Sequence, residues 1–206
     1  MLLAIDTSAG TSVAVVDRDG GILAEVGEAD TMRHAEVVGD LIRAALDASG
    51  TTVSALSGVV AGMGPGPFTG LRVGIAAATA FAFGAGRPLV PVVSHDAVAY
   101  DWYAEGNSGP VIVVTDARRR ERYWTAYSGA DGFGLPVRLD GPGLAKPDEL
   151  PHPDLSRIDA QVVPAGRLGM LAELRYANGL PMDADEALYL RSPDVTLSAG
   201  PKRVTA

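Results

Sequence analysis

The stretch Gly64–Arg72, with the sequence Gly-Pro-Gly-Pro-Phe-Thr-Gly-Leu-Arg, constrains the fold more than any other part of the chain. A short apolar run at 56–61 precedes it, and a segment rich in alanine and aromatic residues follows. This order predicts a buried strand, a tight loop and a helix that begins near Thr69. Such a unit can bind anions, because the first turn of a helix has free N–H groups. Pro65 and Pro67 lack N–H groups and the loop has no lysine, so close packing or partner docking is favoured over phosphate binding.

Composition limits the chemistry that the chain can perform. Its 206 residues, 47% of them hydrophobic, suffice for one large domain or two smaller ones with a full core. The absence of cysteine excludes disulfides and thiol catalysis. His34, His95 and His152 lack the spacing of metal ligands, so no metal site is expected. With a net charge of −8, the chain attracts phosphates weakly, and any nucleic acid would be held mainly by another subunit.

No segment is expected to enter a membrane. The first residues have no basic flank and include Asp6, so they do not read as a signal peptide. The longest uncharged apolar run, 73–86, has 14 residues, which is too short to span a bilayer. We therefore expect a cytoplasmic protein without a membrane partner.

Hydrophobic periodicity predicts an α/β protein. In the first half, a three-strand meander is followed by alternating helices and strands, which implies a mixed sheet with helices on its faces. The second half opens with a similar strand and is then less regular. The predicted strands are 2–5, 12–16, 22–26, 56–61, 89–93, 111–115, 122–127 and 160–163, the predicted helices are 34–48, 69–84, 94–103 and 168–177, and the predicted loops are 132–143 and 147–153.

Two aspartates in equivalent positions hint at a duplicated unit. Asp6 and Asp116 each end the first strand of one half, and the polar stretch 105–110 between the halves is typical of a linker. The predicted division is an N-terminal lobe at 1–104, a smaller, degenerate second lobe at 105–195 and a flexible tail at 196–206.

Five short motifs occur in an order that resembles a known family. They are Ile5-Asp6-Thr7-Ser8, His34-Ala35-Glu36, Gly64–Arg72, Asp116-Ala117-Arg118-Arg119 and Tyr189-Leu190-Arg191. Together they span nearly the whole chain and resemble the TsaB (YeaZ) family, bacterial accessory proteins of threonylcarbamoyladenosine biosynthesis on tRNA. Two positions depart from the family pattern: Pro67 stands where Ser is usual, and Ala187 where Pro often precedes the Tyr-Leu-Arg motif.

The resemblance implies the actin-like, ribonuclease H-like (ASKHA) fold, in which two related α/β lobes each have a mixed sheet flanked by helices. It implies a non-catalytic accessory subunit that helps a TsaD-type transferase modify the adenosine next to the anticodon of ANN-decoding tRNAs. The implied partners are the TsaD-type catalytic paralogue, a TsaE-type ATPase and a second copy of the chain, with tRNA contacted only indirectly. No cofactor of its own is expected, and any ATP or ADP would lie at the partner interface. The alternatives are a stand-alone ASKHA-type ATP-dependent phosphotransferase and a peptidase.

The helices at 34–48 and 69–84 carry the expected partner surface, since relatives in the family pair through them. The second helix is apolar nearly all round, which fits burial inside one chain or between chains. The expected partner-binding residues are His34, Glu36, Val38, Leu41, Ile42, Gly64, Gly66, Phe68, Thr69, Leu71, Arg72, Ile75 and Ala77.

A degenerate nucleotide site is expected between the lobes. By resemblance to ASKHA phosphotransferases, its residues would be Asp6, Thr7, Ser8, Asp116 and Arg118. Asp6 could equally close an Asx-type turn. Asp116 is followed by arginines and no glycine, which makes close approach of a phosphate to the backbone difficult. The basic cluster from Arg118 to Arg122 could touch phosphate or tRNA, or form a solvated hairpin tip.

Two other groupings of reactive residue types are given structural interpretations. Ser94-His95-Asp96 has the residue types of a hydrolase triad, but three consecutive residues cannot converge on one reacting atom, so a helix cap is predicted. His34 and Glu36 do not share a helix face, so a local cap or an interface contact is expected rather than an acid–base pair.

Overall fold

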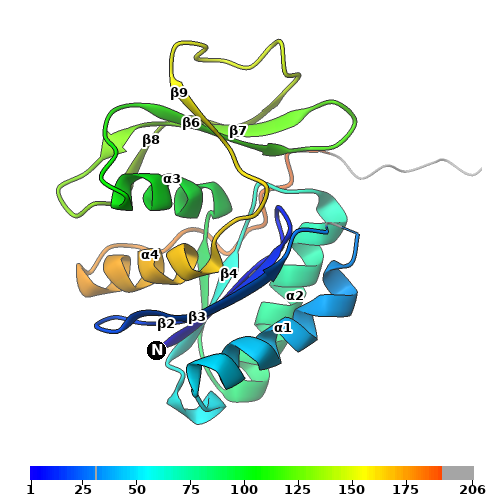
Figure 1. Cartoon of the computed structure of the whole chain (residues 1–206), viewed down its shortest axis with the longest axis vertical. Coiled ribbons are helices and arrows are strands. Elements are labelled where there is room, and N and C mark those ends of the chain that lie inside the picture. Colours follow the sequence, from blue (N-terminus) through cyan, green and yellow to red (C-terminus); the bar gives the residue numbers. More distant parts are fainter. Residues whose placement is uncertain (31, 192–206) are drawn as a thin grey trace, which may run out of the picture.

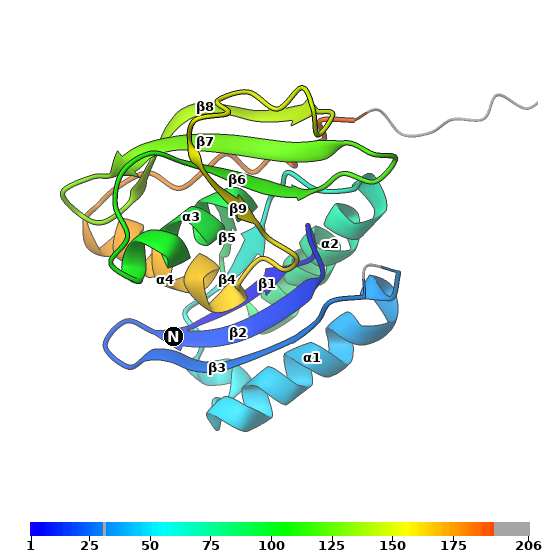
Figure 2. The same cartoon turned by 45° about the horizontal axis from the view of Figure 1, so that its top comes forward.

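The computed structural model describes residues 1–30 and 32–191 and contains two β-sheets (Figure 1). The first sheet has five strands in the order β3-β2-β1-β4-β5, and the second has four in the order β8-β7-β6-β9. Two helices, α3 (Ser94–Ala104) and α4 (Ala165–Ala177), lie between the sheets (Figure 2). The tail predicted at 196–206 lies outside the described residues.

The first sheet is buried on both faces because helices cover both. Its strands are β1 (Leu2–Asp6), β2 (Thr11–Asp17), β3 (Gly21–Glu28), β4 (Gly58–Gly62) and β5 (Leu89–Val92). β1 pairs antiparallel with β2 and parallel with β4, so the strands form a mixed sheet as predicted. Successive side chains of β1 alternate between two cores: Leu3 and Ile5 pack toward α1 and α2, and Leu2 and Ala4 toward α4.

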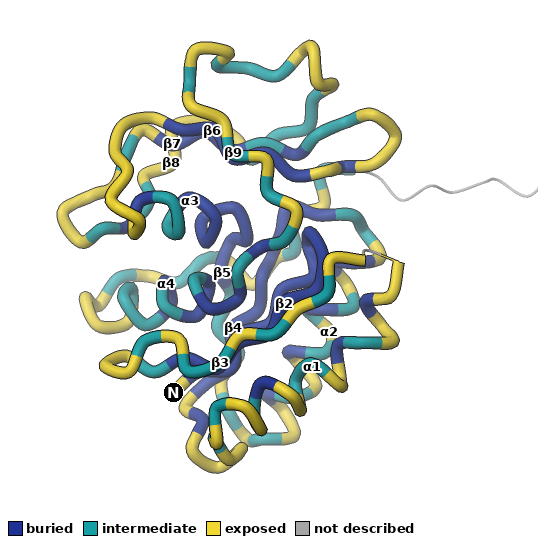
Figure 3. Tube along the Cα trace, in the orientation of Figure 1, coloured by how far each residue is buried: buried dark blue, intermediate teal, exposed yellow. Residues whose placement is uncertain are grey.

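Helices α1 (His34–Ser49) and α2 (Phe68–Ala85) cover one face of this sheet, and α4 covers the other (Figures 1 and 3). A short 3-10 helix, η1 (Val53–Ala55), leads from α1 into β4. Each of the two long helices ends at a glycine in left-handed conformation, Gly50 and Gly86.

The second sheet comprises β6 (Val111–Asp116), β7 (Arg122–Ala130), β8 (Pro136–Ala145) and β9 (Ser156–Asp159). Val111, Val113 and Tyr127 from this sheet join the same core as α3 and α4. The α/β class and two mixed sheets flanked by helices are thus confirmed. The lobe boundary stays a prediction: the sheets divide near 105–110, whereas α4 packs on β1 and β2.

Two element predictions in the second half are wrong. The segment 132–143, predicted as loop, is largely β8, an edge strand paired with β7 through several register shifts. Its glycines are needed there because the Trp124 ring lies where a Cβ of Gly143 would be. The strand predicted at 160–163 lies instead at Ser156–Asp159, and the following residues cross to the first sheet, where the Val163 N–H donates to the Ala9 carbonyl.

Helix α2 exposes much of its apolar surface. At 18 residues, longer than the run read from the sequence, it meets the length and composition of a membrane-spanning helix, a test that core helices also pass. Only 28% of its residues are buried, and the side of the helix that carries them packs on β1 and β4. The open side carries Thr69, Arg72, Ala76, Ala80 and Phe83 at helical spacing.

A buried ionic network fixes α3 against the second sheet and α4. The Asp96 carboxylate accepts hydrogen bonds from Arg138 Nε at 2.7 Å, from Arg175 at 3.1 Å and from the Tyr127 hydroxyl at 2.8 Å. Asp183 bridges the same two arginines and also accepts the Val93 N–H at 2.9 Å. Residues from α3, β7, β8, α4 and the segment after α4 therefore hold the two sheets in one arrangement.

Candidate functional site

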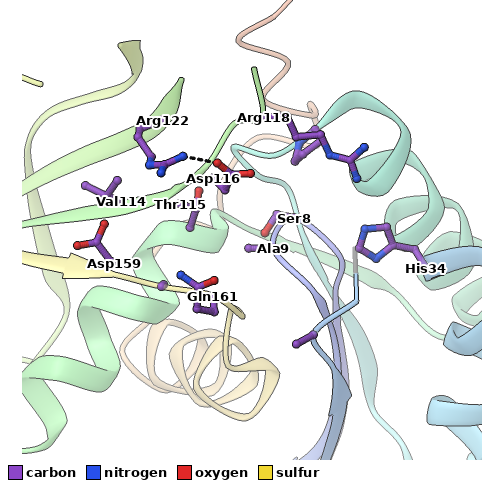
Figure 4. A pocket seen from close by; sticks show the side chains of 13 residues that line it. Ser8, Ala9, His34, Val114, Thr115, Asp116, Arg118, Arg122, Asp159 and Gln161 are labelled. Atoms are coloured by element: carbon purple, nitrogen blue, oxygen red, sulfur yellow. Dashed lines mark hydrogen bonds and ion pairs between the residues drawn. The ribbon is translucent and has the colours of Figure 1, made fainter. Parts of the chain in front are cut away.

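Two adjoining cavities open between the two sheets. The smaller, about 340 Å³, lies between the ends of β1 and β6, and the larger, about 630 Å³, lies between the starts of α1 and α2 and the β6–β7 turn. His34, Pro67 and Arg118 line both. Figure 4 shows the smaller one, with Ser8 and His34 on one side and Asp116 on the other. This is where the sequence predicts the degenerate nucleotide site.

Asp6 does not line either cavity, because its carboxylate is buried and engaged by neighbours. It accepts the Ser8 N–H at 2.8 Å, the Ser8 hydroxyl at 2.5 Å and the Ser94 hydroxyl at 2.5 Å. Burial raises the pKa of Asp6, while these hydrogen bonds act to lower it. A Cβ at Gly62 would overlap the carboxylate, so the space around it is filled. The geometry is that of the Asx-type turn, with a further link to α3.

Of the other residues predicted to bind a nucleotide, one is packed inside the chain and three line the smaller cavity. Thr7 faces inward, and its hydroxyl donates to the Gly70 carbonyl at 2.7 Å. Ser8, Asp116 and Arg118 line the smaller cavity (Figure 4). The Asp116 carboxylate is ion-paired with Arg122 from the start of β7. An aspartate that is held by an arginine presents less negative charge to a metal–phosphate complex than a free one.

The β6–β7 connection is a turn of unusual conformation. Arg118, Arg119 and Arg120 have φ values of 60°, 51° and 62°, the left-handed region that side chains with a Cβ rarely occupy. The cost is about 1–2 kcal/mol per residue relative to right-handed backbone. Arg191 holds the turn from outside: it donates to the Ala117 carbonyl at 3.0 Å and pairs with Glu121. The turn reaches the cavities, where Arg118 and Arg119 line the larger one.

His34 sits at the junction of the two cavities and is largely buried. Its Nδ1 is 2.7 Å from the Thr11 hydroxyl, and a Cβ at Gly70 would come within 2.9 Å of its Nε2. Burial and the nearby positive charge of Arg118 lower the pKa of His34, so the imidazole is neutral near pH 7. Glu36 points away to solvent and pairs with Arg33 at 2.9 Å, so the two residues form no acid–base pair.

Comparisons with known proteins place the chain in a family. The family model for tRNA N6-adenosine threonylcarbamoyltransferase (TsaD) matches residues 6–132. An uncharacterized protein of Mycobacterium tuberculosis is 40% identical over 94% of this chain and 92% of its own length. The tRNA threonylcarbamoyladenosine biosynthesis protein TsaB of Escherichia coli is 28% identical over 94% and 83%. The structure of YeaZ from Pseudomonas aeruginosa superposes with a TM-score of 0.75 at 26% identity, over 93% of this chain and 99% of that one.

The chain belongs to the family that the threonylcarbamoyltransferase model describes, and within it the chain is a TsaB-type member. The resemblance drawn from the five motifs is thereby confirmed, as is the ASKHA-like fold.

In this TsaB-type chain, four of the predicted partner-binding residues besides His34 are buried inside the chain. Val38 and Leu71 are buried in packing against the sheet, and Gly64 and Gly66 are buried in the loop before α2. A Cβ at Gly66 would lie 2.7 Å from the Ser8 Cα, which confirms that the loop glycines permit close backbone packing. These four residues are therefore unavailable to a partner in this conformation.

The remaining predicted residues of the two helices reach the surface to different degrees. Glu36, Thr69 and Arg72 are exposed, while Leu41, Ile42, Phe68, Ile75 and Ala77 are half-buried. The sequence interpretation missed Ala76, Ala80 and Phe83, whose side chains form the open face of α2. The 3.6-residue period from Thr69 could have identified them, because a helix packed on a sheet must turn one stripe outward.

The three residues of Ser94-His95-Asp96 point in three directions. The Ser94 hydroxyl accepts the Gly64 N–H at 2.9 Å and donates to Asp6. His95 is fully buried between the hydroxyls of Thr125 and Thr115, at 2.8 and 2.9 Å. No triad forms, as predicted. The helix-cap interpretation is wrong, because Val93 occupies the cap position and the Ser94 side chain makes no capping hydrogen bond.

Within residues 1–30 and 32–191, no group of three or more histidine and acidic side chains is arranged to hold a metal ion. His152, in the loop after β8, contacts Asp140 at 2.9 Å on the far side of the second sheet.

Proposed function

We propose that the chain is a non-catalytic accessory subunit of tRNA threonylcarbamoyladenosine biosynthesis that acts by docking on a TsaD-type transferase. Similarity to the E. coli protein of that pathway, over 94% of this chain, supports the pathway. The observation that carries the docking is the open face of α2, on which Ala76, Ala80 and Phe83 form an exposed apolar stripe. A helix of this composition that leaves an apolar stripe in water is typical of a surface that another protein covers.

The open face of α2 is well suited to another helix. Thr69, Ala76 and Ala80 are small, so a partner backbone can approach closely, and Phe83 at the far end is 89% exposed. A large exposed aromatic beside small residues is the arrangement of an anchor for a pocket in the partner. We assign the partner surface to this stripe and to the neighbouring exposed residues of α1. A second copy of the chain would compete for the same stripe.

The engaged carboxylates argue against chemistry by the chain alone. A phosphotransferase of this fold would use Asp6 and Asp116, and here one is enclosed by hydroxyl groups and the other is paired with Arg122. A hydrolase would need a nucleophile with a base in reach, and Ser94 instead bonds to Asp6. The stand-alone phosphotransferase and the peptidase are accordingly not favoured.

The test is a charge placed on the open face. Phe83→Glu should keep the fold, because the side chain is already in water, and should weaken binding to the purified TsaD-type transferase by about tenfold or more. Tyr176→Glu is the matched control, since Tyr176 is 76% exposed on α4, across the first sheet. Binding is measured by calorimetry, and tRNA modification is assayed with and without each variant. Normal binding by folded Phe83→Glu would remove this surface from the proposal.

Nucleotide, if required, would bind where the chain meets its partner and not to the chain alone. Titration of ATP into the isolated chain should give no heat, whereas ATP added to the chain, transferase and TsaE-type ATPase together should give more heat than ATP added to the transferase and the ATPase without the chain. Tight ATP binding by the isolated chain would instead revive the stand-alone phosphotransferase. We place the protein in the cytoplasm, where the tRNA substrate of the transferase is found.

A further inference from the structure

The Tyr-Leu-Arg motif near the end of the described chain forms a strap across the larger cavity. The Leu188 N–H donates to the Met63 carbonyl at 2.8 Å, which fixes the strap to the loop before α2. Three residues further on, Arg191 donates to the Ala117 carbonyl and pairs with Glu121, which fixes the strap to the β6–β7 turn. The strap thus joins the first and second sheets at the rim of the cavity.

Between these anchors, Tyr189 packs against the first turn of α2. Its ring centroid lies 5.0 Å from that of Phe68 at an interplanar angle of 49°. The Arg72 guanidinium lies 3.9 Å from the Phe68 centroid and 5.8 Å from the Tyr189 centroid, both within cation–π range. Arg72 Nε also approaches the Tyr189 hydroxyl at 3.4 Å, the long limit of a hydrogen bond. The arginine is therefore held by two aromatic rings.

Arg72 is held in this way without an acidic partner among residues 1–30 and 32–191. Stacking occupies the face of a guanidinium and leaves N–H groups on its edge free to bind a carboxylate. It also restricts the side chain before any partner arrives, which lowers the entropy lost on binding. Arg72 belongs to the same open face of α2 as Phe83.

We propose that Arg72 binds a carboxylate of the docking partner and that Tyr189 is the positioning residue that holds its guanidinium ready. This inference rests on the proposed function, because it adds a charged contact to the same docking surface. The partner group is an Asp or Glu side chain of the TsaD-type transferase that faces the start of α2. The Tyr189 ring does the positioning, and its hydroxyl contributes little at 3.4 Å.

The test is a double-mutant cycle on binding to the purified transferase. Arg72→Gln should raise the Kd by about tenfold and flatten its dependence on salt, because a charge pair is lost. Tyr189→Ala should raise the Kd by a similar factor, and Tyr189→Phe should bind like the wild type because the ring stays. The double variant Arg72→Gln/Tyr189→Ala should bind no more weakly than Arg72→Gln alone, because Tyr189 acts through Arg72.

Two controls make the outcome decisive. Arg157→Gln removes the same charge from β9, where Arg157 pairs with Asp159, and should leave the Kd and the salt dependence unchanged. Thermal unfolding of Tyr189→Ala should stay close to the wild type, since the residue is 39% exposed near the end of the described chain. The positioning role is overturned if Tyr189→Ala binds as tightly as the wild type. It is also overturned if the effects of the two substitutions on the free energy of binding add in the double variant. A wild-type chain that does not bind the transferase overturns the proposed function and this inference together.

Discussion

At the scale of single residues, the buried Asp96 of α3 links this helix to β8 and α4. Asp96, at 1% exposure, balances two arginines that come from β8 and α4. The positive charges of Arg138 and Arg175 are tolerated at this junction because Asp96 and Asp183 both pair with them. Nothing in the local sequence around Asp96 indicates partners 42 and 79 residues away.

We therefore expect Asp96→Asn to lower the free energy of unfolding by about 3–5 kcal/mol, because it leaves Asp183 as the one carboxylate of the network for two partly buried arginines. Asp101→Asn is the control on the same helix. Its pair with Arg167 is partly exposed, and its loss should cost about 1 kcal/mol or less. Urea denaturation of the two variants measures both. Equal costs would mean that the Asp96 network does not stabilise the fold.

His95 makes stability depend on pH. Burial, with a smaller effect of Arg138, lowers the pKa of His95 from 6.5 to about 3. The unfolded chain then binds more protons than the folded chain between these values, so stability is complete above pH 6.5 and falls as the pH falls. From pH 7 to pH 5 the expected loss from this residue is about 2 kcal/mol.

The contribution of His95 to the pH dependence of stability is isolated by comparing the wild type with His95→Gln. The glutamine amide can form hydrogen bonds to both threonines without taking up a proton. The raised pKa of Asp6 acts with the opposite sign, because the folded chain holds that proton more tightly, and it is common to both proteins. The wild type should lose about 2 kcal/mol more than the variant between pH 7 and pH 5. Parallel unfolding curves would show that His95 is protonated in the folded chain.

At the scale of elements, the two faces of α2 differ in the space that they leave for a side chain. Gly74 lies against β1, and a Cβ there would overlap the Thr7 side chain. Gly84 lies in the last turn on the open side, where a Cβ would meet nothing within 4 Å. The same residue type therefore serves close packing at one position and costs helix stability at the other.

Gly74→Ala and Gly84→Ala should change stability in opposite directions. The first should destabilise the chain by about 1–3 kcal/mol through overpacking, and the second should stabilise it by about 0.5–1 kcal/mol through helix propensity. Thermal or urea unfolding gives both values. If Gly74→Ala were also stabilising, the close contact of α2 with β1 would be wrong.

At the scale of the whole molecule, the net charge of −8 governs contact with nucleic acid. Phosphate contacts supply most of the affinity of non-specific tRNA binding, and an acidic protein repels the polyanion. The β6–β7 turn, with Arg118, Arg119 and Arg120, is a local region of positive charge in this acidic chain. Glu121 beside the turn is paired with Arg191.

The isolated chain should accordingly bind tRNA no more tightly than about 10⁻⁴ M at about 0.15 M salt. Filter binding with the chain alone, with the TsaD-type transferase alone and with both together measures this. Micromolar binding by the isolated chain at that salt would show that it contacts tRNA directly.

The alternating α/β order could be predicted from the amino-acid sequence, because hydrophobic period and turn residues are local properties. Five motifs also indicated the family, and a triad at Ser94-His95-Asp96 could be excluded because adjacent side chains diverge. The strand β8 escaped prediction, since Gly and Pro residues at 136–143 normally indicate loop and only pairing with β7 makes them strand.

Which of the predicted residues are accessible depends on how distant segments of the chain pack together. Asp6 is enclosed because α3 brings Ser94 to it from 88 residues away, and Asp116 is paired because the hairpin returns Arg122 beside it. Leu71 and Phe83 lie in one helix, yet one is buried and the other is in water. Such differences depend on what packs against each side chain, and long-range contacts leave no periodic signal in a single sequence.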